Sequence, residues 1–126
     1  MKANEFRIGN YVSFEDRIFK IDSIANVFPT LDTAEFGIGV VDWNNIKPVP
    51  LTEEWLLNFG FNKKVDEYVF QDYAIEDIHN GVTWILKEFD YDSVCFVAIG
   101  KGINYVHQLQ NLYFALVGEE LELKNK

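Results

Sequence analysis

The amino-acid sequence predicts an α+β fold: a small N-terminal antiparallel β module, then a helix, a three-stranded antiparallel meander and a second helix that packs on the meander. Three observations predict it. Short alternating runs with glycines fill residues 7–49, helix start and stop signals bracket two segments, and residues 68–99 alternate with a period of two. We expect a β-rich module with a proline-containing connector over 1–50 and an α+β module over 51–126, together forming one compact unit.

The N-terminal module is expected to contain short, twisted strands. Residues 7–14 and 18–23 are separated by a turn at 15–16, and a third strand is expected over 36–41. This spacing is compatible with an SH3-like barrel and equally with a simple curved sheet. Residues 46–50, IKPVP, are interpreted as an extended connector, because each proline fixes its own φ and keeps the preceding residue out of the helical region.

The segment 51–61, LTEEWLLNFGF, carries the signals of a short helix. Thr52 is the predicted N-cap, and the two glutamates that follow it complement the positive end of the helix dipole. Gly60 is expected to end the helix in the left-handed conformation. Phe61 then folds back onto Leu56, which predicts a Schellman ending with its apolar contact.

The meander is predicted as strands near 68–78, 82–89 and 94–99. Its first turn contains Asn80-Gly81, the dipeptide that most readily supplies two positive φ values, and its second turn is expected at 90–93. Residues 100–102 are interpreted as a connector.

The second helix is predicted over about 104–117 and is followed by a final edge strand at 120–123. Gly118 is the predicted stop signal of this helix. On a helical wheel one apolar stripe is expected to face the meander, and it consists of Val106, Leu109, Leu112, Tyr113, Leu116 and Val117.

The opposite face of this helix is unusual because residues 103–118, INYVHQLQNLYFALVG, carry no formal charge, although 25% of the chain does. A solvated helix normally has charged residues on its outer side, so the face formed by His107, Asn111 and Phe114 is expected to be covered. Either the N-terminal module of the same chain or a homodimer or other protein partner would cover it. These three residues are the candidate interaction surface.

The formal net charge of −9 disfavours direct binding of nucleic acid or of anionic membranes. The acidic residues concentrate in 66–92. Such acidity is typical of a soluble surface, and the alternative is an acidic DNA mimic that inhibits a host nucleic-acid enzyme. The mimic requires the carboxylates to cluster on one face at phosphate-like spacing.

The single cysteine, Cys95, lies in an apolar alternating run and is interpreted as a core residue of a protein made in a reducing compartment. The first residues contain no apolar segment typical of a signal peptide, and no window approaches the roughly 20 apolar residues of a membrane span. We therefore expect a cytoplasmic protein.

No catalytic or metal-binding motif is recognisable. His79, Cys95 and His107 lack the spacing of zinc ligands, and no nucleophile and base occur in a recognisable order. The turn at 100–102 could hold an anion but is typical of a plain connector. We predict no catalytic residue, no metal and no cofactor. An enzyme acting on a small molecule would need a deep pocket in which one of the histidines lies beside a perturbed carboxylate.

Three stretches resemble a family of small uncharacterised proteins from Bacteroides and related gut bacteria. They are NEFRIGNYV at 4–12, IKPVPLTEEWLLNFGF at 46–61 and INYVHQLQNLYFALVGEELEL at 103–123. The resemblance implies a prophage or mobile-element context and no catalytic residue. Taken with the uncharged helix, it leads us to expect a non-enzymatic interaction or accessory protein.

Overall fold

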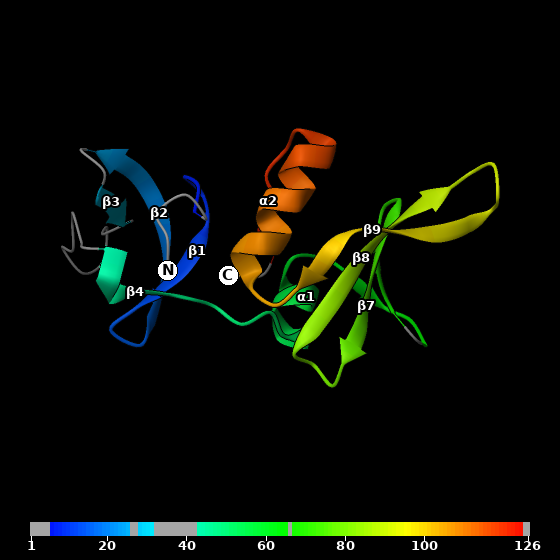
Figure 1. Cartoon of the computed structure of the whole chain (residues 1–126), viewed down its shortest axis with the longest axis horizontal. Coiled ribbons are helices and arrows are strands. Elements are labelled where there is room, and N and C mark those ends of the chain that lie inside the picture. The colour runs from blue at the N-terminus through cyan, green and yellow to red at the C-terminus, as the bar shows by residue number, and fades with distance from the viewer. Residues whose placement is uncertain (1–5, 26–27, 32–42, 66, 125–126) are drawn as a thin grey trace. The chain divides into compact units, whose positions relative to one another are not determined.

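The computed structural model describes residues 6–25, 28–31, 43–65 and 67–124, and it confirms the α+β class. Two antiparallel sheets and two α-helices are present in these ranges (Figure 1). The chain groups into two compact units: Met1–Val49 with Tyr105–Glu120 (unit 1), and Pro50–Asn104 with Leu121–Lys126 (unit 2). The second helix therefore groups with the N-terminal sheet, whereas the expected division placed it in the module 51–126.

Unit 1 contains a four-stranded sheet with the strand order β3-β2-β1-β4. The strands are β1 (Tyr11–Phe14), β2 (Arg17–Ala25), β3 (Phe28–Leu31) and β4 (Ile46–Pro48), and the 3₁₀ turn η2 (Trp43–Asn45) precedes β4. Its core cluster consists of Phe6, Val12, Phe19, Ile21 and Ile46, with Phe14 packed against it.

The predicted turn at 15–16 is confirmed, because Phe14 pairs with Arg17 and both turn residues have positive φ. The connector prediction is corrected in part: Ile46–Pro48 forms the strand β4 and pairs with β1. A proline is tolerated there because β4 is an edge strand. The strand expected over 36–41 lies outside the described residues, as does any closure into an SH3-like barrel.

The second helix, α2 (Val106–Val117), ends as predicted at Gly118, which has a φ of 83°. Tyr105 occupies the N-cap position, and its backbone N–H donates to the side chain of Gln108. The helix begins slightly later than expected because Tyr105 still has an extended backbone, with a φ of −128°. The first helical N–H, that of Val106, donates to Val49 O, which belongs to the chain leaving β4.

Unit 2 begins with the helix α1 (Glu53–Asn58), whose predicted caps are confirmed. Thr52 accepts a hydrogen bond from the backbone N–H of Trp55 at 3.4 Å. At the other end, Gly60 has a φ of 102° and Phe61 N donates to Leu56 O at 3.0 Å, as a Schellman motif requires.

The sheet of unit 2 has five strands in the order β5-β6-β7-β8-β9. They are β5 (Asn62–Lys63), β6 (Tyr68–Phe70), β7 (Tyr73–His79), β8 (Thr83–Asp90) and β9 (Cys95–Ile103). The expected strand over 68–78 is interrupted by a turn at Gln71, which has a positive φ. Asn80 and Gly81 form the predicted hairpin turn, with φ values of 47° and 80°.

Two predictions about the later segments are wrong. Residues 100–102 do not connect a strand to a helix but belong to β9, where the pairing shifts from Leu86↔Ile99 to Trp84↔Ile103. The extra residues form a bulge that glycine permits, since Gly100 has a φ of 71°. No strand forms over 120–123; there Leu121 is buried instead.

The core of unit 2 surrounds Trp84, whose indole N–H donates to Leu51 O at 3.1 Å. Leu56, Phe59 and Ile75 are fully buried. In the ranges that the structure describes, no helix is long and apolar enough to cross a membrane.

Candidate functional site

The buried face of α2 differs from the predicted stripe. The buried residues are Val106, His107, Leu109, Gln110 and Tyr113, whereas Leu116 is 41% exposed. Three of the predicted stripe residues, Val106, Leu109 and Tyr113, are therefore buried. The buried side of the helix is rotated from the predicted stripe toward the uncharged polar face.

His107 lies in the interior and not on an accessible surface. Its side chain is 2% exposed, and its ring contacts the ring of Phe6 with centroids 4.6 Å apart. Tyr105 stacks on it at 6.0 Å. The N-terminal segment of unit 1 thus covers this part of the face.

Asn111 is held by the same segment through two hydrogen bonds. Its Oδ1 accepts from Arg7 Nε at 3.0 Å and from Asn10 Nδ2 at 2.8 Å. The neighbouring Gln110 binds backbone groups, donating to Gly9 O at 3.0 Å and accepting from Tyr11 N at 2.9 Å. Asn10 and Gln110 are both buried, and these bonds satisfy their amide groups.

Arg7 is the central residue of this contact, and it was not among the residues predicted from the sequence. Its guanidinium donates to both carboxylate oxygens of Glu120, at 2.5 and 3.0 Å. The same group lies over the ring of Phe114, 4.4 Å from its centroid. The absence of charge on α2 was the one signal in the sequence that something covers this helix. Nothing in the sequence pattern indicated that Arg7 does so.

Phe114 is the member of the predicted surface that keeps substantial exposure, at 39%. The sequence left two possible covers for this face, the same chain or another protein. In unit 1 the N-terminal segment of the same chain covers His107 and Asn111. Phe114 is therefore the accessible remainder of this α2 face.

The acidic residues of 66–92 do not lie on a single face. Glu67 and Glu76 both contact Lys87, at 3.7 and 2.9 Å. Strand alternation places Glu88 and Asp90 on the opposite side of β8 from Lys87. The described carboxylates of this segment are therefore divided between the two faces of the sheet.

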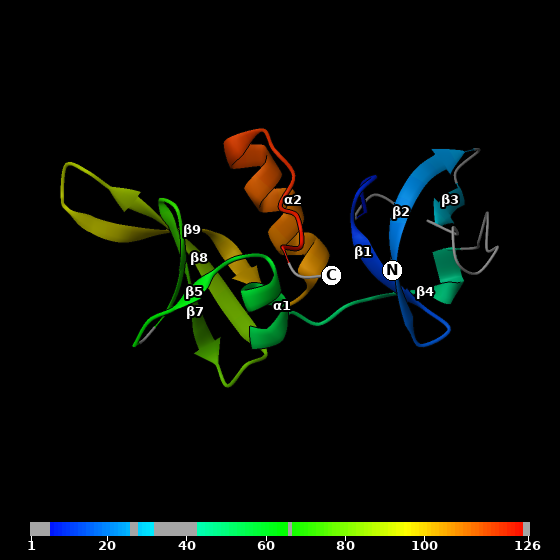
Figure 2. The same cartoon turned by 180° about the vertical axis from the view of Figure 1, so that it is seen from behind.

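A second uncharged stretch is exposed, and it was not predicted from the sequence. Residues 93–100, SVCFVAIG, carry no formal charge, and Cys95 is an exposed free thiol, so its assignment to the core is wrong. β8 and β9 continue past the start of β7, which pairs through Tyr73 with Glu88. Figure 1 shows this two-stranded arm, coloured yellow, running beyond β7, and Figure 2 shows it from behind. We call residues 89–97 the β8–β9 arm.

Large apolar side chains are exposed on the arm. Tyr91, Val94 and Val97 are 68%, 73% and 46% exposed. Phe89 holds the arm together by packing edge-on against Tyr91 and Phe96, with ring centroids at 4.7 and 5.2 Å. The arm is therefore ordered by its own aromatic contacts while presenting apolar residues to solvent.

Three hydrogen bonds to carboxylates shift the pKa values of groups on the arm. Asp90 accepts from the Ser93 hydroxyl and from Asp92 N, and these bonds lower the pKa of Asp90. Tyr91 donates its hydroxyl proton to Asp72 at 2.5 Å, which raises the pKa of Tyr91. Asp90 therefore stays charged at the tip.

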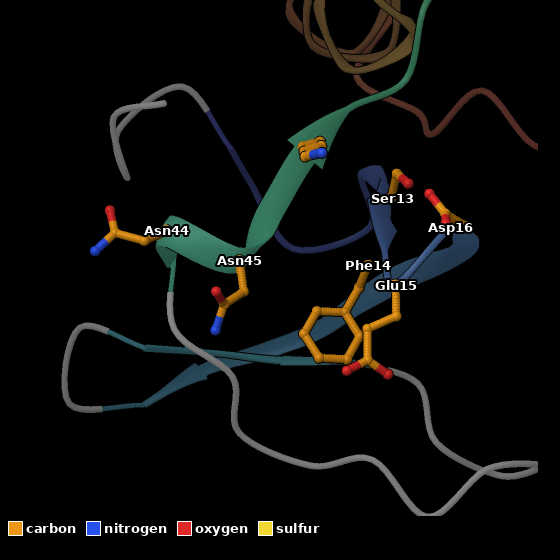
Figure 3. Close-up of a pocket in the computed structure, with 7 residues that line it drawn as sticks. Ser13, Phe14, Glu15, Asp16, Asn44 and Asn45 are labelled. Carbon is orange, nitrogen blue, oxygen red and sulfur yellow. The ribbon is translucent and has the colours of Figure 1, made fainter.

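A polar hollow of about 420 Å³ lies in unit 1 at the β1–β2 turn. Figure 3 shows that its side chains do not converge: Phe14 and Glu15 point one way, Ser13 and Asp16 another, and Asn44 projects outward. Strand alternation requires Ser13 and Phe14 to face opposite sides. This arrangement provides no set of groups aimed at one reacting atom.

The described ranges contain no group of three or more His, Cys, Asp or Glu side chains that could hold a metal ion. Comparison of the chain with protein-family models, curated proteins and solved structures finds no match. The resemblance to the Bacteroides family stays a prediction.

Proposed function

We propose that this protein is a non-enzymatic interaction protein that binds another protein through the β8–β9 arm. The observation that carries the proposal is the exposure of Tyr91, Val94 and Val97 on an ordered arm. Exposed apolar residues that lie together are typical of interaction surfaces, whereas single scattered ones are not.

The backbone at the tip supports the same proposal. Val94 has a φ of 55°, a conformation that costs a β-branched residue about 1–2 kcal/mol. Its side chain is also the most exposed of the large apolar residues on the arm. Val94 thus contributes neither a favourable backbone conformation nor buried area, which agrees with a role in binding.

Photo-crosslinking in the native host tests the proposal. A photoreactive amino acid at Val94 should crosslink to a specific protein, identified by mass spectrometry. The matched control is the same amino acid at Val82, which is 58% exposed at the opposite end of β8. Crosslinks that are absent at Val94, or equal at both positions, would contradict the proposal.

The exposed part of α2 is a second candidate surface, and it retains one residue of the original hypothesis. Phe114 is 39% exposed and lies in an uncharged part of the helix. Phe114→Asp should leave unit 1 folded, because the new carboxylate can pair with Arg7, whose guanidinium now lies over the ring. Loss of a partner in Phe114→Asp, but not in Val94→Gly, would move the function to α2.

A role as an accessory protein of a prophage or mobile element rests on the family resemblance alone. Deleting the gene in a strain that carries it, and then measuring element transfer and induction, would test that role.

A further inference from the structure

The open edge of β9 has the properties of a strand-docking site. β9 is the last strand of the five-stranded sheet, and no strand in the described part of the chain pairs with its other side. Between Cys95 and Ile99 its pairing to β8 is regular, and the bulge begins only afterwards. This part carries no charge and no proline, the features that usually protect an edge from pairing.

Acidic side chains lie directly behind this edge on one face of the arm. Val97 pairs with Glu88, and Cys95 pairs with Asp90. Paired residues share a face, with Cβ atoms about 5 Å apart. A hollow of about 480 Å³, lined in part by Glu88, Asp90, Val97 and Ile99, lies on this face.

The other face of the same edge has a different chemistry. Phe96 pairs with Phe89, and Ala98 pairs with Lys87, whose ammonium is engaged by Glu76. An added strand would therefore meet carboxylates on one side and mainly apolar atoms on the other.

We propose that this edge takes up an extended segment of a partner protein in which Lys or Arg alternates with aliphatic residues. The proposal rests on the proposed function and specifies the partner. Backbone groups of the segment pair with β9. Each cationic side chain lays its apolar stem over Val97 or Cys95 and reaches Glu88 or Asp90 with its charge, while the aliphatic residues face Phe96 and Ala98.

Charge complementarity favours this occupant over a second copy of the chain. Antiparallel pairing through the regular Cys95–Ile99 part of a second β9 would place uncharged residues opposite Val97 and leave Glu88 unpaired. It would also bring together two chains that each carry a net charge of −9. An alternating basic strand supplies the missing charges.

The carboxylates differ in how far they are already engaged. Asp90 accepts hydrogen bonds within its own turn, at 2.9 Å from Ser93 Oγ and 3.0 Å from Asp92 N. Glu88 is exposed on the strand, outside that turn. Glu88 is therefore the residue to vary, because replacing Asp90 would also disturb the turn.

The test uses the full chain and a fluorescent nine-residue peptide of alternating Lys and Val, with binding followed by anisotropy. We expect saturable binding that weakens as salt is added. Glu88→Lys should weaken it by about tenfold, since like charges are then brought together. Glu122→Lys, an equal charge change at an exposed position in the same unit, is the control and should change affinity by less than about twofold.

Two further peptides separate strand addition from general attraction. Peptides N-methylated at alternate residues cannot pair along one of their edges, so one of the two methylation patterns should abolish binding. A peptide of the same composition with its lysines grouped together should bind less tightly than the alternating one. Circular dichroism of Glu88→Lys establishes that the variant is folded.

The outcomes distinguish this proposal from the one on which it rests. Equal losses for the two charge variants, or binding by both methylated peptides, would overturn strand addition of a basic segment. A specific crosslink at Val94 without peptide binding would also overturn it while leaving the interaction function standing. A crosslink to a second copy of the chain would replace the basic segment with a homodimer. If neither crosslinks nor peptide binding are found, both proposals fail.

Discussion

The contact between Asn10 and Asn111 decides whether α2 is covered by its own chain, and it can be measured directly. Asn111→Ala removes the acceptor of the hydrogen bond from Asn10 Nδ2, and the side chain of Asn10 is fully buried. An unsatisfied buried donor costs about 1–3 kcal/mol. The same change removes the 3.0 Å bond from Arg7 Nε, although Arg7 remains anchored on Glu120. We expect the free energy of unfolding to fall by about 1–3 kcal/mol.

The assay is urea denaturation followed by circular dichroism, as a double-mutant cycle with Asn10→Ala. Residues in direct contact couple by about 0.5–3 kcal/mol, so the double variant should lose less stability than the sum of the two single variants. Leu116→Met, a change of similar volume and helix propensity at a 41% exposed position of the same helix, is the control and should change stability by less than about 0.5 kcal/mol. Additive effects, or an Asn111→Ala loss no larger than that of the control, would refute covering by the same chain.

Three further predictions concern unit 2 and the helix ends. Gly60→Ala should lower the free energy of unfolding more than Gly118→Ala. Both glycines have left-handed φ, but a Cβ at Gly60 meets side-chain carbons at 3.2–3.3 Å, whereas one at Gly118 meets nothing within 4 Å. Equal losses in urea titrations would exclude crowding at Gly60. Tyr91 should titrate at higher pH than a free tyrosine, because its hydroxyl donates to Asp72 and this raises its pKa. The bond's contribution to the free energy of unfolding is present below the ordinary tyrosine pKa and is lost as pH rises through the raised one. In Asp72→Ala, absorbance titration should show the pKa of Tyr91 returned to its ordinary value. An unchanged titration would contradict the bond. Val94→Gly should raise the unfolding midpoint slightly, since relief of about 1–2 kcal/mol of strain exceeds the loss of chain entropy. A less stable Val94→Gly would show that the side chain stabilises the fold.

Local signals in the sequence were sufficient for the helix ends and the tight turns. Thr52, Gly60 and Gly118 act through hydrogen bonds and φ values that involve only neighbouring residues, so residue type alone predicts their role. The Asn80-Gly81 turn is of the same kind. The turn at Gln71 carries no comparable signal, because glutamine has no preference for positive φ and the flanking residues continue the alternation.

Contacts between distant segments were not predictable in this way. The proline-containing segment 46–48 is extended, as expected, but whether it pairs with β1 depends on the remainder of unit 1. The wheel placed Leu116 in the apolar stripe and His107 opposite it, yet the segment that begins at Phe6 covers the polar side. A wheel gives the relative angles of side chains, whereas the covering segment selects which side is buried.

The two uncharged stretches of the chain illustrate the same limit and support the proposed function. Residues 103–118 looked like a surface awaiting a partner, and Arg7 and Asn10 of the same chain meet that need through hydrogen bonds to Asn111. In the stretch 93–100, Cys95 was expected to be a core residue, yet Cys95, Val94 and Val97 are exposed. Composition shows that a segment lacks charged residues, but it does not show which part of the chain, or which partner, buries that segment. Within the described residues, β9 has a neighbouring strand on one side only, so its uncharged edge is where a partner would contribute most.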